Sequence, residues 1–423
     1  MTGSGMTGSD MAGSGMRGYP EQSLRVLQVQ SASRTSGGAD AVMDFEAELL
    51  SSAGHVVERY VHPAVADELA GTRAALRTAA EVVWNPAAAA EVARRSRAFS
   101  ADIVHVHSPY PRLSPAVFAA AARSGAATVT TMHNYRLACP VATLAYQDRP
   151  CEACVGRRVK LPAVKRRCYH ASRAATAAMA GSLTLHRAAG SFSRHLHRSL
   201  VFTEFARELF IREGLPADRI GLQANAVPDP GEPQHRSGPF GGVLFVGRLV
   251  PEKGIDTLLS AFEGLPGVPL HIAGDGPLRG QVEAAAGRHD SIRYHGWLGD
   301  AGLAALFDRA DLLVVPSTWY EGQPLVMLQA MAAGLPLLVS GLDNLAQTAG
   351  VPDAGQTFRM GDTEDLRRQI RASVADLEGL RSRGRTARRL YSERHTPTRA
   401  LVDLVGNYRA ARTTADISGR SRA

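Results

Sequence analysis

The chain alternates between short apolar runs and longer segments in which apolar residues recur with helical spacing. The runs that we predict to be buried strands cover 24–30, 102–107, 127–133, 242–247, 269–274, 311–317 and 335–340. Helical segments lie between them, including 39–53, 115–123, 255–262 and 324–333. This order predicts parallel sheets covered by helices on both faces, because parallel neighbours need a crossover connection.

The pattern breaks at 226–242, where proline and glycine are dense and periodicity stops. We therefore predict two α/β domains, and 423 residues with 45% hydrophobic residues supply a core for each. The expected organisation is a disordered tail at 1–22, a first domain at 23–228, a linker at 229–241, a second domain at 242–395, a helix packing back on the first domain at 396–410, and a disordered tail at 411–423. Because such sheets bind ligands at the carboxyl ends of their strands, we expect a cleft between the domains.

The net charge of +8 is concentrated in one segment, 153–203, which contains ten lysine and arginine residues and no aspartate or glutamate. A solvated basic face and attraction to an anionic membrane surface both explain this basic segment. Nucleic acid is not an expected partner, because no recognition motif accompanies the charge. The tail at 1–22 lacks the apolar core of a signal peptide, and no apolar run is long enough to cross a bilayer. We expect a cytoplasmic protein, with peripheral contact to the inner face of the plasma membrane as an option.

Two loops at predicted strand ends suit a phosphate. Gly37 and Gly38 allow close backbone approach just before a helix, whose first N–H groups point at whatever lies there. Arg248 and Lys253 follow another strand just before a helix, so two cations and a helix N-terminus converge on one spot, which suits a diphosphate.

Two further loops add candidate contacts to a nucleotide and a sugar. Gly274 and Gly276 form a turn after a strand, for which turn geometry and nucleotide contact are both adequate explanations. Glu321 lies in the loop before a helix that begins near Pro324, and Gln329 lies in the second turn of that helix. Gln329 shares a face with apolar and small residues, so the amide either reaches toward the ligand or is a core glutamine bonded to nearby backbone.

Seven motifs follow one another along the chain: "SGGAD", "HVHSPY", "TMHNYRLACP", "GRLVPEKG", "AGDGP", "PSTWYEGQPLVMLQAMAAGLP" and "YSERHTPTRALVDLVGNYR". Taken together, they resemble a family 4 glycosyltransferase of the GT-B fold, over about residues 24–409. The resemblance implies two Rossmann-like, doubly wound parallel-sheet domains facing a cleft. It also implies transfer of a sugar from a nucleotide-diphosphate donor to a hydroxyl, with retention of configuration and without a catalytic metal.

The family's functional residues fall on matching positions of this chain. Arg248 and Lys253 match the pair that holds the diphosphate, and Gly37 and Gly38 match the loop that closes over it. His133 matches a histidine beside the reacting sugar. In this picture the cations stabilise the leaving diphosphate, and the departing phosphate takes the proton of the acceptor.

The chain departs from the family at one position. The family has two acids separated by seven residues; Glu321 matches the first, which meets the hydroxyls of the donor sugar, and Gln329 stands where the second binds the ribose. An amide accepts with one end and donates with the other, so we expect donor binding weaker by about 1–2 kcal/mol if nothing compensates.

The cysteines all lie in one stretch, 139–168, which we read as an insert of the acceptor-side domain. They are Cys139, Cys151, Cys154 and Cys168. A structural zinc site, with His170 or His133 as substitute ligands, free thiols and a disulfide all remain open. His105 and His107 alternate along a strand and are expected in the core or cleft lining, and Trp84 is expected to serve packing.

The nature of the acceptor is inferred from charge alone. The basic segment favours a lipid-linked glycan or a surface polysaccharide under construction. Two rival functions stay open: a nucleotide-sugar-binding protein without turnover, which would tolerate Gln329, and a glycan phosphorylase or sugar synthase on the same fold.

Overall fold

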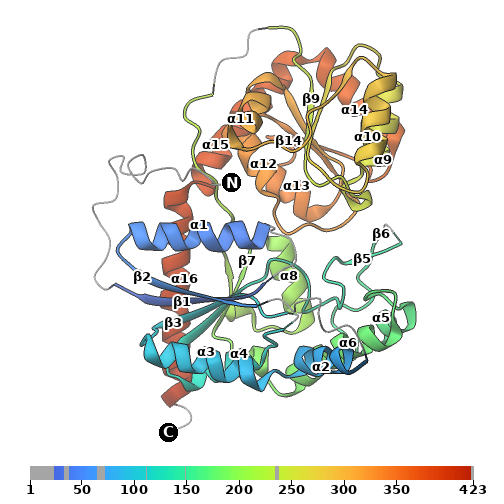
Figure 1. The fold of residues 1–423 in the computed structure, drawn as a ribbon. Helices are drawn as coiled ribbons and strands as arrows, with labels where there is room; N and C mark the ends of the chain where they lie inside the picture. The colour runs from blue at the N-terminus through green and yellow to red at the C-terminus, as the bar shows by residue number, and fades with distance from the viewer. Residues whose placement is uncertain are drawn as a thin grey trace.

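A computed structural model describes residues 23–32, 38–63, 72–110, 112–147, 149–233 and 238–420. Within them the chain forms two α/β lobes, one above the other in Figure 1. The predicted disordered tail at 1–22 and the candidate Gly37 lie outside the described residues.

The first lobe is built on a parallel sheet of six strands in the order β2-β1-β3-β4-β7-β8. Its strands are β1 (Arg25–Ser31), β2 (Val56–His62), β3 (Ile103–Ser108), β4 (Ala127–Thr131), β7 (Arg198–Val201) and β8 (Ile220–Leu222). Its helices are α1 (Gly38–Ser52), α2 (Thr72–Val83), α3 (Pro86–Ala98), α4 (Ala116–Arg123), α5 (Leu161–Arg166), α6 (Arg173–Ala188), α7 (Ser191–Arg194) and α8 (Glu204–Glu213), with a 3-10 turn at Ala217–Arg219. The strand order reverses between β1 and β3, which is where ligands bind in doubly wound sheets.

Both faces of this sheet are buried, as the apolar runs predicted. Val26 packs in a cluster with α1 and the last helix, whereas its neighbour Leu27 packs on the opposite face with α3 and α4. This alternation follows from the pleat, since successive side chains point to opposite faces. The cysteine-rich insert lies beside the sheet and contains a short antiparallel ribbon, β5 (Ala145–Tyr146) and β6 (Arg149–Pro150).

The second lobe is also a parallel sheet of six strands, in the order β11-β10-β9-β12-β13-β14. Its strands are β9 (Val243–Val246), β10 (Leu270–Ala273), β11 (Ile292–Tyr294), β12 (Leu312–Val315), β13 (Leu337–Ser340) and β14 (Gly355–Phe358). Its helices are α9 (Ile255–Glu263), α10 (Arg279–Arg288), α11 (Asp300–Arg309), α12 (Leu325–Ala332), α13 (Asp343–Ala349), α14 (Thr363–Ala375) and α15 (Leu377–Arg394), with a 3-10 turn at Pro251–Lys253. The order reverses between β9 and β12. Two doubly wound parallel sheets are the fold class that the sequence predicted.

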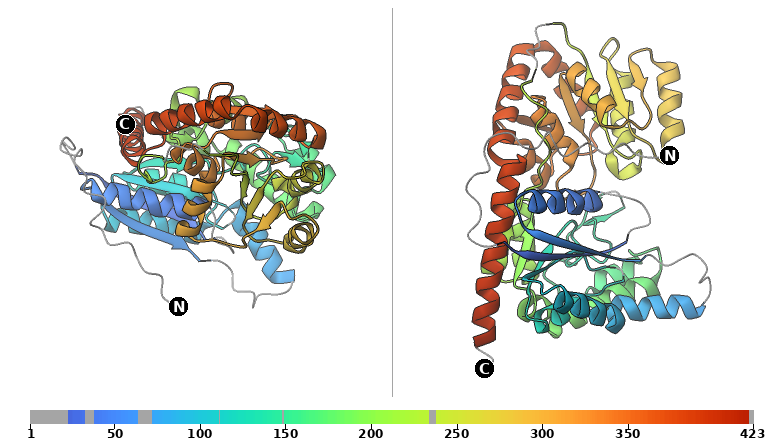
Figure 2. Two further views of the ribbon diagram at one scale, coloured as in Figure 1. Left: turned by 90° about the horizontal axis from the view of Figure 1, so that it is seen from above. Right: turned by 60° about the vertical axis from the view of Figure 1, so that its left-hand side comes forward.

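The last helix, α16 (Pro397–Arg420), crosses from the second lobe to the first and runs along its side (Figure 2). It packs on α1, β4 and β7, and the ring of Tyr408 is fully buried. The expected return helix is therefore present, but it continues to Arg420. The prediction of a disordered tail from residue 411 is wrong for residues 411–420, because Ala411 still packs in the core of the first lobe.

Candidate functional site

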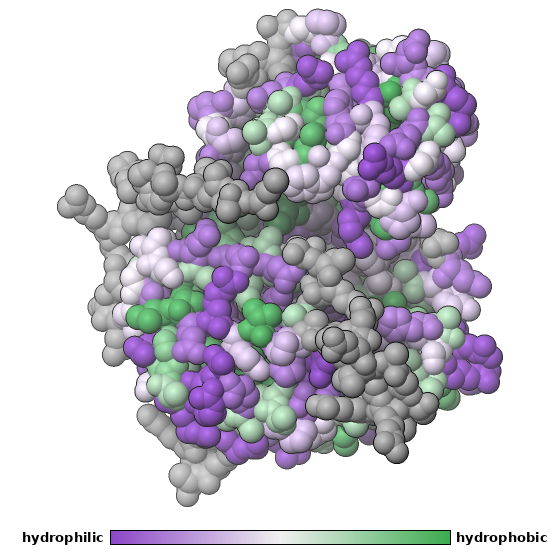
Figure 3. Space-filling view, in the orientation of Figure 1, coloured by the Kyte–Doolittle hydropathy of each residue, from purple (hydrophilic) through white to green (hydrophobic). Residues whose placement is uncertain are grey.

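The candidate site lies where the carboxyl ends of the two sheets face each other, and the surface is indented between the lobes (Figure 3). On the side of the second lobe, the loops after β9 and β12 flank the reversal of strand order and carry Lys253 and Glu321. On the side of the first lobe, the loop after β4 carries His133, and the N-terminus of α1 follows β1.

Lys253 and Glu321 form an ion pair between these two loops. The Lys253 Nζ lies 2.5 Å from Glu321 Oε2, and the side chains are 18% and 8% exposed. Ser317 Oγ donates to the other carboxylate oxygen. Gly254 makes the approach of the loops possible, since it adopts a φ of +73° and a Cβ there would lie 1.9 Å from the carbonyl oxygen of Pro316.

The backbone of Glu321 is fixed from both lobes. Its carbonyl accepts a hydrogen bond of 3.0 Å from the hydroxyl of Tyr135, in the first lobe, and another from the amide of Asn344. A Cβ on Gly322 would lie 2.9 Å from the carbonyl oxygen of His133, so only glycine lets the lobes approach this closely. The loop of Glu321 thus contacts the loop of His133 directly, and the structure brings together the two residues that the sequence singled out.

His133 is held by a second histidine. Its Nε2 lies 3.1 Å from Nδ1 of His107, with the two rings stacked 5.3 Å apart. Burial lowers the pKa of His133 to about 4, against a smaller opposing effect from Asp40. The imidazole is therefore neutral at physiological pH and can hydrogen-bond a sugar hydroxyl without adding charge.

Arg248 and the glycine turn lie on the same side of the second sheet. Arg248 is exposed, and its guanidinium makes no hydrogen bond to another residue that the structure describes. Gly274 and Gly276 have a packing role: a Cβ on Gly274 would lie 1.9 Å from the carbonyl oxygen of Gly247, and one on Gly276 would lie 2.6 Å from that of Leu249. The glycines therefore hold the two loops after β9 and β10 together.

Gln329 lies on α12 and is partly buried. It lines a cavity of about 170 Å³ between the lobes, opposite residues of α1 that include Glu46. Gly38 is the first residue of α1, and a Cβ there would have nothing within 4 Å. Gln329 therefore lies at the junction of the lobes, and Gly38 begins the helix whose later residues line the same cavity.

The four cysteines carry free thiols in this structure. Burial raises the pKa of Cys154 and of Cys168, and the neighbouring sulfurs of Cys139 and Cys151 add to both shifts, so the four thiols lie near one another. Four cysteines are a donor set that suits zinc. Within the described ranges, however, no three of these sulfurs lie within 4.8 Å of one another, so the arrangement is more open than a tetrahedral zinc site.

Several site residues have no signal in the sequence that we recognised. Ser317 contacts Glu321 from within the same loop, whereas Tyr135 from the first lobe and Asn344 on α13 reach it only through the tertiary fold. His105 and His107 are fully buried, as expected, while Trp84 stacks on the ring of His186 at 5.1 Å.

Comparison with known proteins agrees with this geometry. Residues 241–376 match the family model "Glycosyl transferases group 1". The match lies within the second lobe and spans β9 to α14. The matched range includes the candidate residues Arg248, Lys253, Glu321 and Gln329.

Two curated relatives share part of the chain. Over 185 residues it is 34% identical to a glycogen synthase of Mycobacterium tuberculosis, covering 42% of each protein. Over 129 residues it is 35% identical to a phosphatidyl-myo-inositol mannosyltransferase of Mycobacterium leprae, covering 29% of this chain and 34% of the relative. The chain thus spans less than half the length of these curated relatives.

The whole fold has a counterpart among solved structures. Alr3699/HepE from Anabaena, solved in complex with UDP and glucose, superposes with a TM-score of 0.62 at 15% identity, over 90% of this chain and 98% of that one. These findings confirm the resemblance to a family 4 glycosyltransferase and the GT-B fold.

Proposed function

We propose that this protein transfers a sugar from a nucleotide-diphosphate sugar to a hydroxyl acceptor, with retention of configuration and without a catalytic metal. The observation that carries the proposal is the contact between the Glu321 and His133 loops, because it joins a donor-binding domain to the opposite lobe at one point. The match to the glycosyl transferases group 1 model and the UDP- and glucose-bound structural relative support a nucleotide-sugar donor.

Each residue has a role that follows from its charge and position. Arg248, Lys253 and the N-terminus of α9 stabilise the negative charge of the leaving diphosphate, as a metal ion does in other enzymes. Glu321 accepts hydrogen bonds from hydroxyls of the donor sugar, and neutral His133 contacts the sugar from the opposite lobe. The leaving phosphate takes the proton of the acceptor, so no side chain acts as nucleophile.

The ion pair of Lys253 and Glu321 occupies the donor position before the substrate arrives. When the donor binds, its diphosphate satisfies Lys253 and its hydroxyls satisfy Glu321, so both partners keep charge-assisted hydrogen bonds. Gln329 supplies a neutral amide toward the nucleotide, and Gly38 and the turn of Gly274 and Gly276 complete the walls of the site.

The acceptor side points to a membrane surface. Around α5, exposed basic residues surround two exposed aliphatic side chains, Val159 at 59% and Leu161 at 51%. The exposed basic residues are Arg157, Arg158, Lys165, Arg166 and Arg167. Lys160 does not belong to this surface, because it is buried in an ion pair of 2.6 Å with Glu213. We name Val159, Leu161 and these five basic residues the α5 surface.

Basic residues around exposed aliphatic side chains suit an anionic bilayer, where charge attracts and aliphatic groups insert. The structure contains no helix, among the residues it describes, with the length and apolarity needed to cross a membrane. We therefore propose peripheral binding to the inner face of the plasma membrane and a lipid-linked or surface-polysaccharide acceptor. The partial identity to a phosphatidyl-myo-inositol mannosyltransferase supports this acceptor class.

We also propose that Cys139, Cys151, Cys154 and Cys168 bind a structural zinc ion in the acceptor-side insert. The chemistry of the donor set supports this. The guanidinium of Arg166 also donates to Cys151 Sγ at 3.1 Å. The site would fix the insert that carries the α5 surface, and it takes no part in the transfer.

The test of the function is release of nucleotide diphosphate from a panel of UDP-, GDP- and ADP-sugars, with and without a bacterial lipid extract. The native protein should consume one donor, faster with lipid, and Glu321→Ala should not. A protein that is stabilised against heat by nucleotide but consumes no donor would instead be a nucleotide-sugar-binding protein, the alternative that Gln329 favours.

A further inference from the structure

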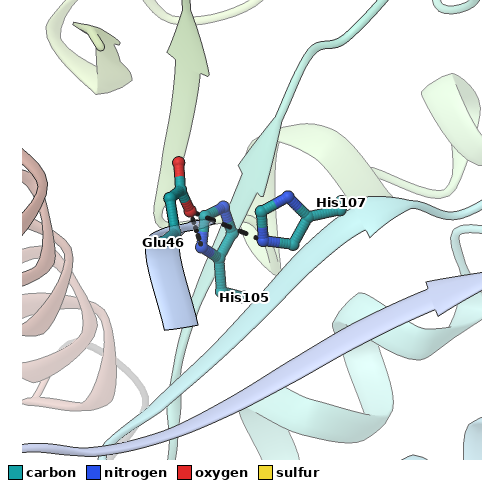
Figure 4. Close-up of side chains that lie close together, drawn as sticks. All are labelled: Glu46, His105 and His107. Atoms are coloured by element: carbon teal, nitrogen blue, oxygen red, sulfur yellow. Dashed lines mark ion pairs between the residues drawn. The ribbon is translucent and has the colours of Figure 1, made fainter. Parts of the chain in front are cut away.

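A buried cluster of titratable side chains lies next to His133, and the transfer mechanism above does not use it. Glu46 on α1 points toward His105 and His107 on β3 (Figure 4). The three residues are 5%, 0% and 1% exposed. Glu46 Oε2 lies 3.6 Å from His105 Nδ1 and 3.6 Å from His107 Nε2.

The hydrogen bonds of the two histidines differ. Both ring nitrogens of His105 are engaged, Nδ1 with the hydroxyl of Tyr408 at 2.9 Å and Nε2 with that of Thr131 at 2.8 Å. His107 uses Nδ1 for His133, and its Nε2 has no partner among the described residues. Glu46 Oε2 is also unpartnered there. Two buried polar atoms without partners thus face each other, which carries a free-energy cost unless a proton joins them.

The charge states allow such a proton. Burial raises the pKa of Glu46 to about 8, so its carboxyl group is protonated at neutral pH. Burial lowers the pKa of His107 far below its ordinary value and that of His133 to about 4, so both rings are neutral. A protonated carboxyl donates one hydrogen bond, and a neutral imidazole accepts at one nitrogen and donates at the other.

Other titratable groups face the cluster from the surrounding elements. Asp40 at the start of α1 raises the pKa of His133, and Arg59 on β2 lowers that of His107. Tyr408 on α16 contacts His105, and burial keeps its hydroxyl protonated by raising its pKa. From the second lobe, α12 brings the neutral amide of Gln329 to the cavity that Glu46 lines. None of these groups supplies a hydrogen bond to His107 Nε2.

We propose that Glu46 is a positioning residue that sets the tautomer of His133 through His107. The Glu46 carboxyl donates its proton to His107 Nε2, so His107 donates from Nδ1 to His133 Nε2. His133 then carries its own proton on Nδ1, the nitrogen left for the ligand, and acts as a donor toward the cleft. Formation of the Glu46 bond needs the two side chains to approach by roughly half an ångström.

The direction of this chain depends on the ionisation of Glu46. A carboxylate only accepts, so above the pKa of Glu46 the bond is satisfied when His107 holds its proton on Nε2. His107 Nδ1 then accepts from His133 Nε2–H, and His133 Nδ1 becomes an acceptor. One ionisation buried in the first lobe thus reverses the hydrogen-bonding role of a residue in the cleft. The identity of the ligand as a sugar rests on the proposed function. The coupling of the His107 and His133 tautomers to Glu46 does not rest on it.

The direct test is nitrogen-15 NMR of the full chain with labelled histidine, at pH 6.5 and pH 9.5. In the native protein His107 and His133 should carry the proton on Nδ1 at pH 6.5 and on Nε2 at pH 9.5. Glu46→Gln should keep both on Nδ1 at both values, because its amide donates and does not titrate. Tyr408→Phe, which changes only the His105 side of the cluster, should switch as the native protein does.

The proposal is overturned if His133 holds its proton on Nε2 at pH 6.5, or if Glu46→Gln switches with pH. Donor consumption gives a second readout. The rate of the native protein should fall above about pH 8, through a lower kcat and not a higher KM. Glu46→Gln should lose this decline, and Glu46→Ala should be at least tenfold slower at every pH. Glu46→Gln as slow as Glu46→Ala, with an unchanged melting temperature, would contradict it. If no variant consumes a donor, the proposed function fails, while the tautomers still decide the chain.

Discussion

Replacement of Lys253 by methionine tests whether the ion pair with Glu321 organises the proposed donor site. Methionine keeps most of the length and packing of the lysine stem but removes the cation. Glu321 then has a carboxylate whose side chain is 8% exposed and whose remaining partner on one oxygen is Ser317. Removing one member of a poorly exposed pair typically costs about 3–5 kcal/mol, and the 18% exposure of Lys253 places this pair nearer to about 2 kcal/mol.

The double variant Lys253→Met with Glu321→Gln separates this effect from simple loss of packing. Gln removes the uncompensated charge, so the double variant should be more stable than Lys253→Met alone. The double-mutant cycle should give a coupling of about 1–2 kcal/mol. Urea unfolding measures the free energies, and nucleotide binding should be weaker by about 10- to 100-fold in both variants, since a charge-assisted hydrogen bond to the diphosphate is lost.

The reasoning is refuted if the effects of the two substitutions on the free energy of unfolding are additive. If the coupling in unfolding free energy is below about 0.3 kcal/mol, the two side chains are not paired in solution. Unchanged nucleotide binding in Lys253→Met would separately remove this lysine from the donor site. Arg207→Met is a matched control, because it removes a surface arginine paired at 3.6 Å with Glu204 and should leave both measurements within error.

Three further predictions concern metal, membrane and pH. The purified chain should contain about one zinc ion by mass spectrometry. The double variant Cys151→Ser with Cys154→Ser should lose the metal and have a lower melting temperature, with unchanged donor binding. A native protein without metal would exclude the zinc site. Val159→Asp with Leu161→Asp should reduce cosedimentation with anionic vesicles more than tenfold, whereas Val56→Asp, at an exposed aliphatic position on β2, should not. Equal loss in both variants would contradict an oriented α5 surface. Each of the buried His105, His133 and His395, with pKa values of about 3, 4 and 4, should lower the free energy of unfolding by about 1–2 kcal/mol between pH 6.5 and 5, because the unfolded state takes up protons that these residues do not. Glu46 opposes this fall in part, since its folded pKa lies above the whole interval. The free energy of unfolding should also decline between pH 6.5 and 8, because folded Glu46, with a pKa of about 8, holds a proton that the unfolded state releases. A flat profile between these pH values, or a decline that persists in Glu46→Gln, would contradict the burial of this carboxyl.

Much of the fold could be predicted because it depends on local patterns. Buried parallel strands such as 311–317 are short apolar runs, and Pro324 and Gly334 delimit the helix between β12 and β13 well. The length of α16 was underestimated, since its last turns are polar enough to resemble a tail, and it is the packing of Ala411 on the first lobe that extends the helix.

In the candidate site, too, some residues could be predicted from local sequence patterns and others depend on tertiary packing. Lys253 and Glu321 were found because loops at the ends of parallel strands meet at one edge, but their ion pair depends on how those two loops lean toward each other. Glu46 was missed because a carboxylate on an amphipathic helix normally faces solvent, and only the stacking of α1 on β3 buries it beside two histidines. Sequence spacing cannot report a burial of this kind.

The central claim is that this chain transfers a sugar, and the most direct test follows the sugar itself. The native protein is incubated with a carbon-13-labelled donor, a bacterial lipid extract and EDTA, and the lipids are analysed by mass spectrometry and NMR. The account predicts that one lipid-linked acceptor gains one labelled sugar with the anomeric configuration of the donor, and that Glu321→Gln gives no such product. Donor that stays intact, or label that appears only as free sugar, would contradict it.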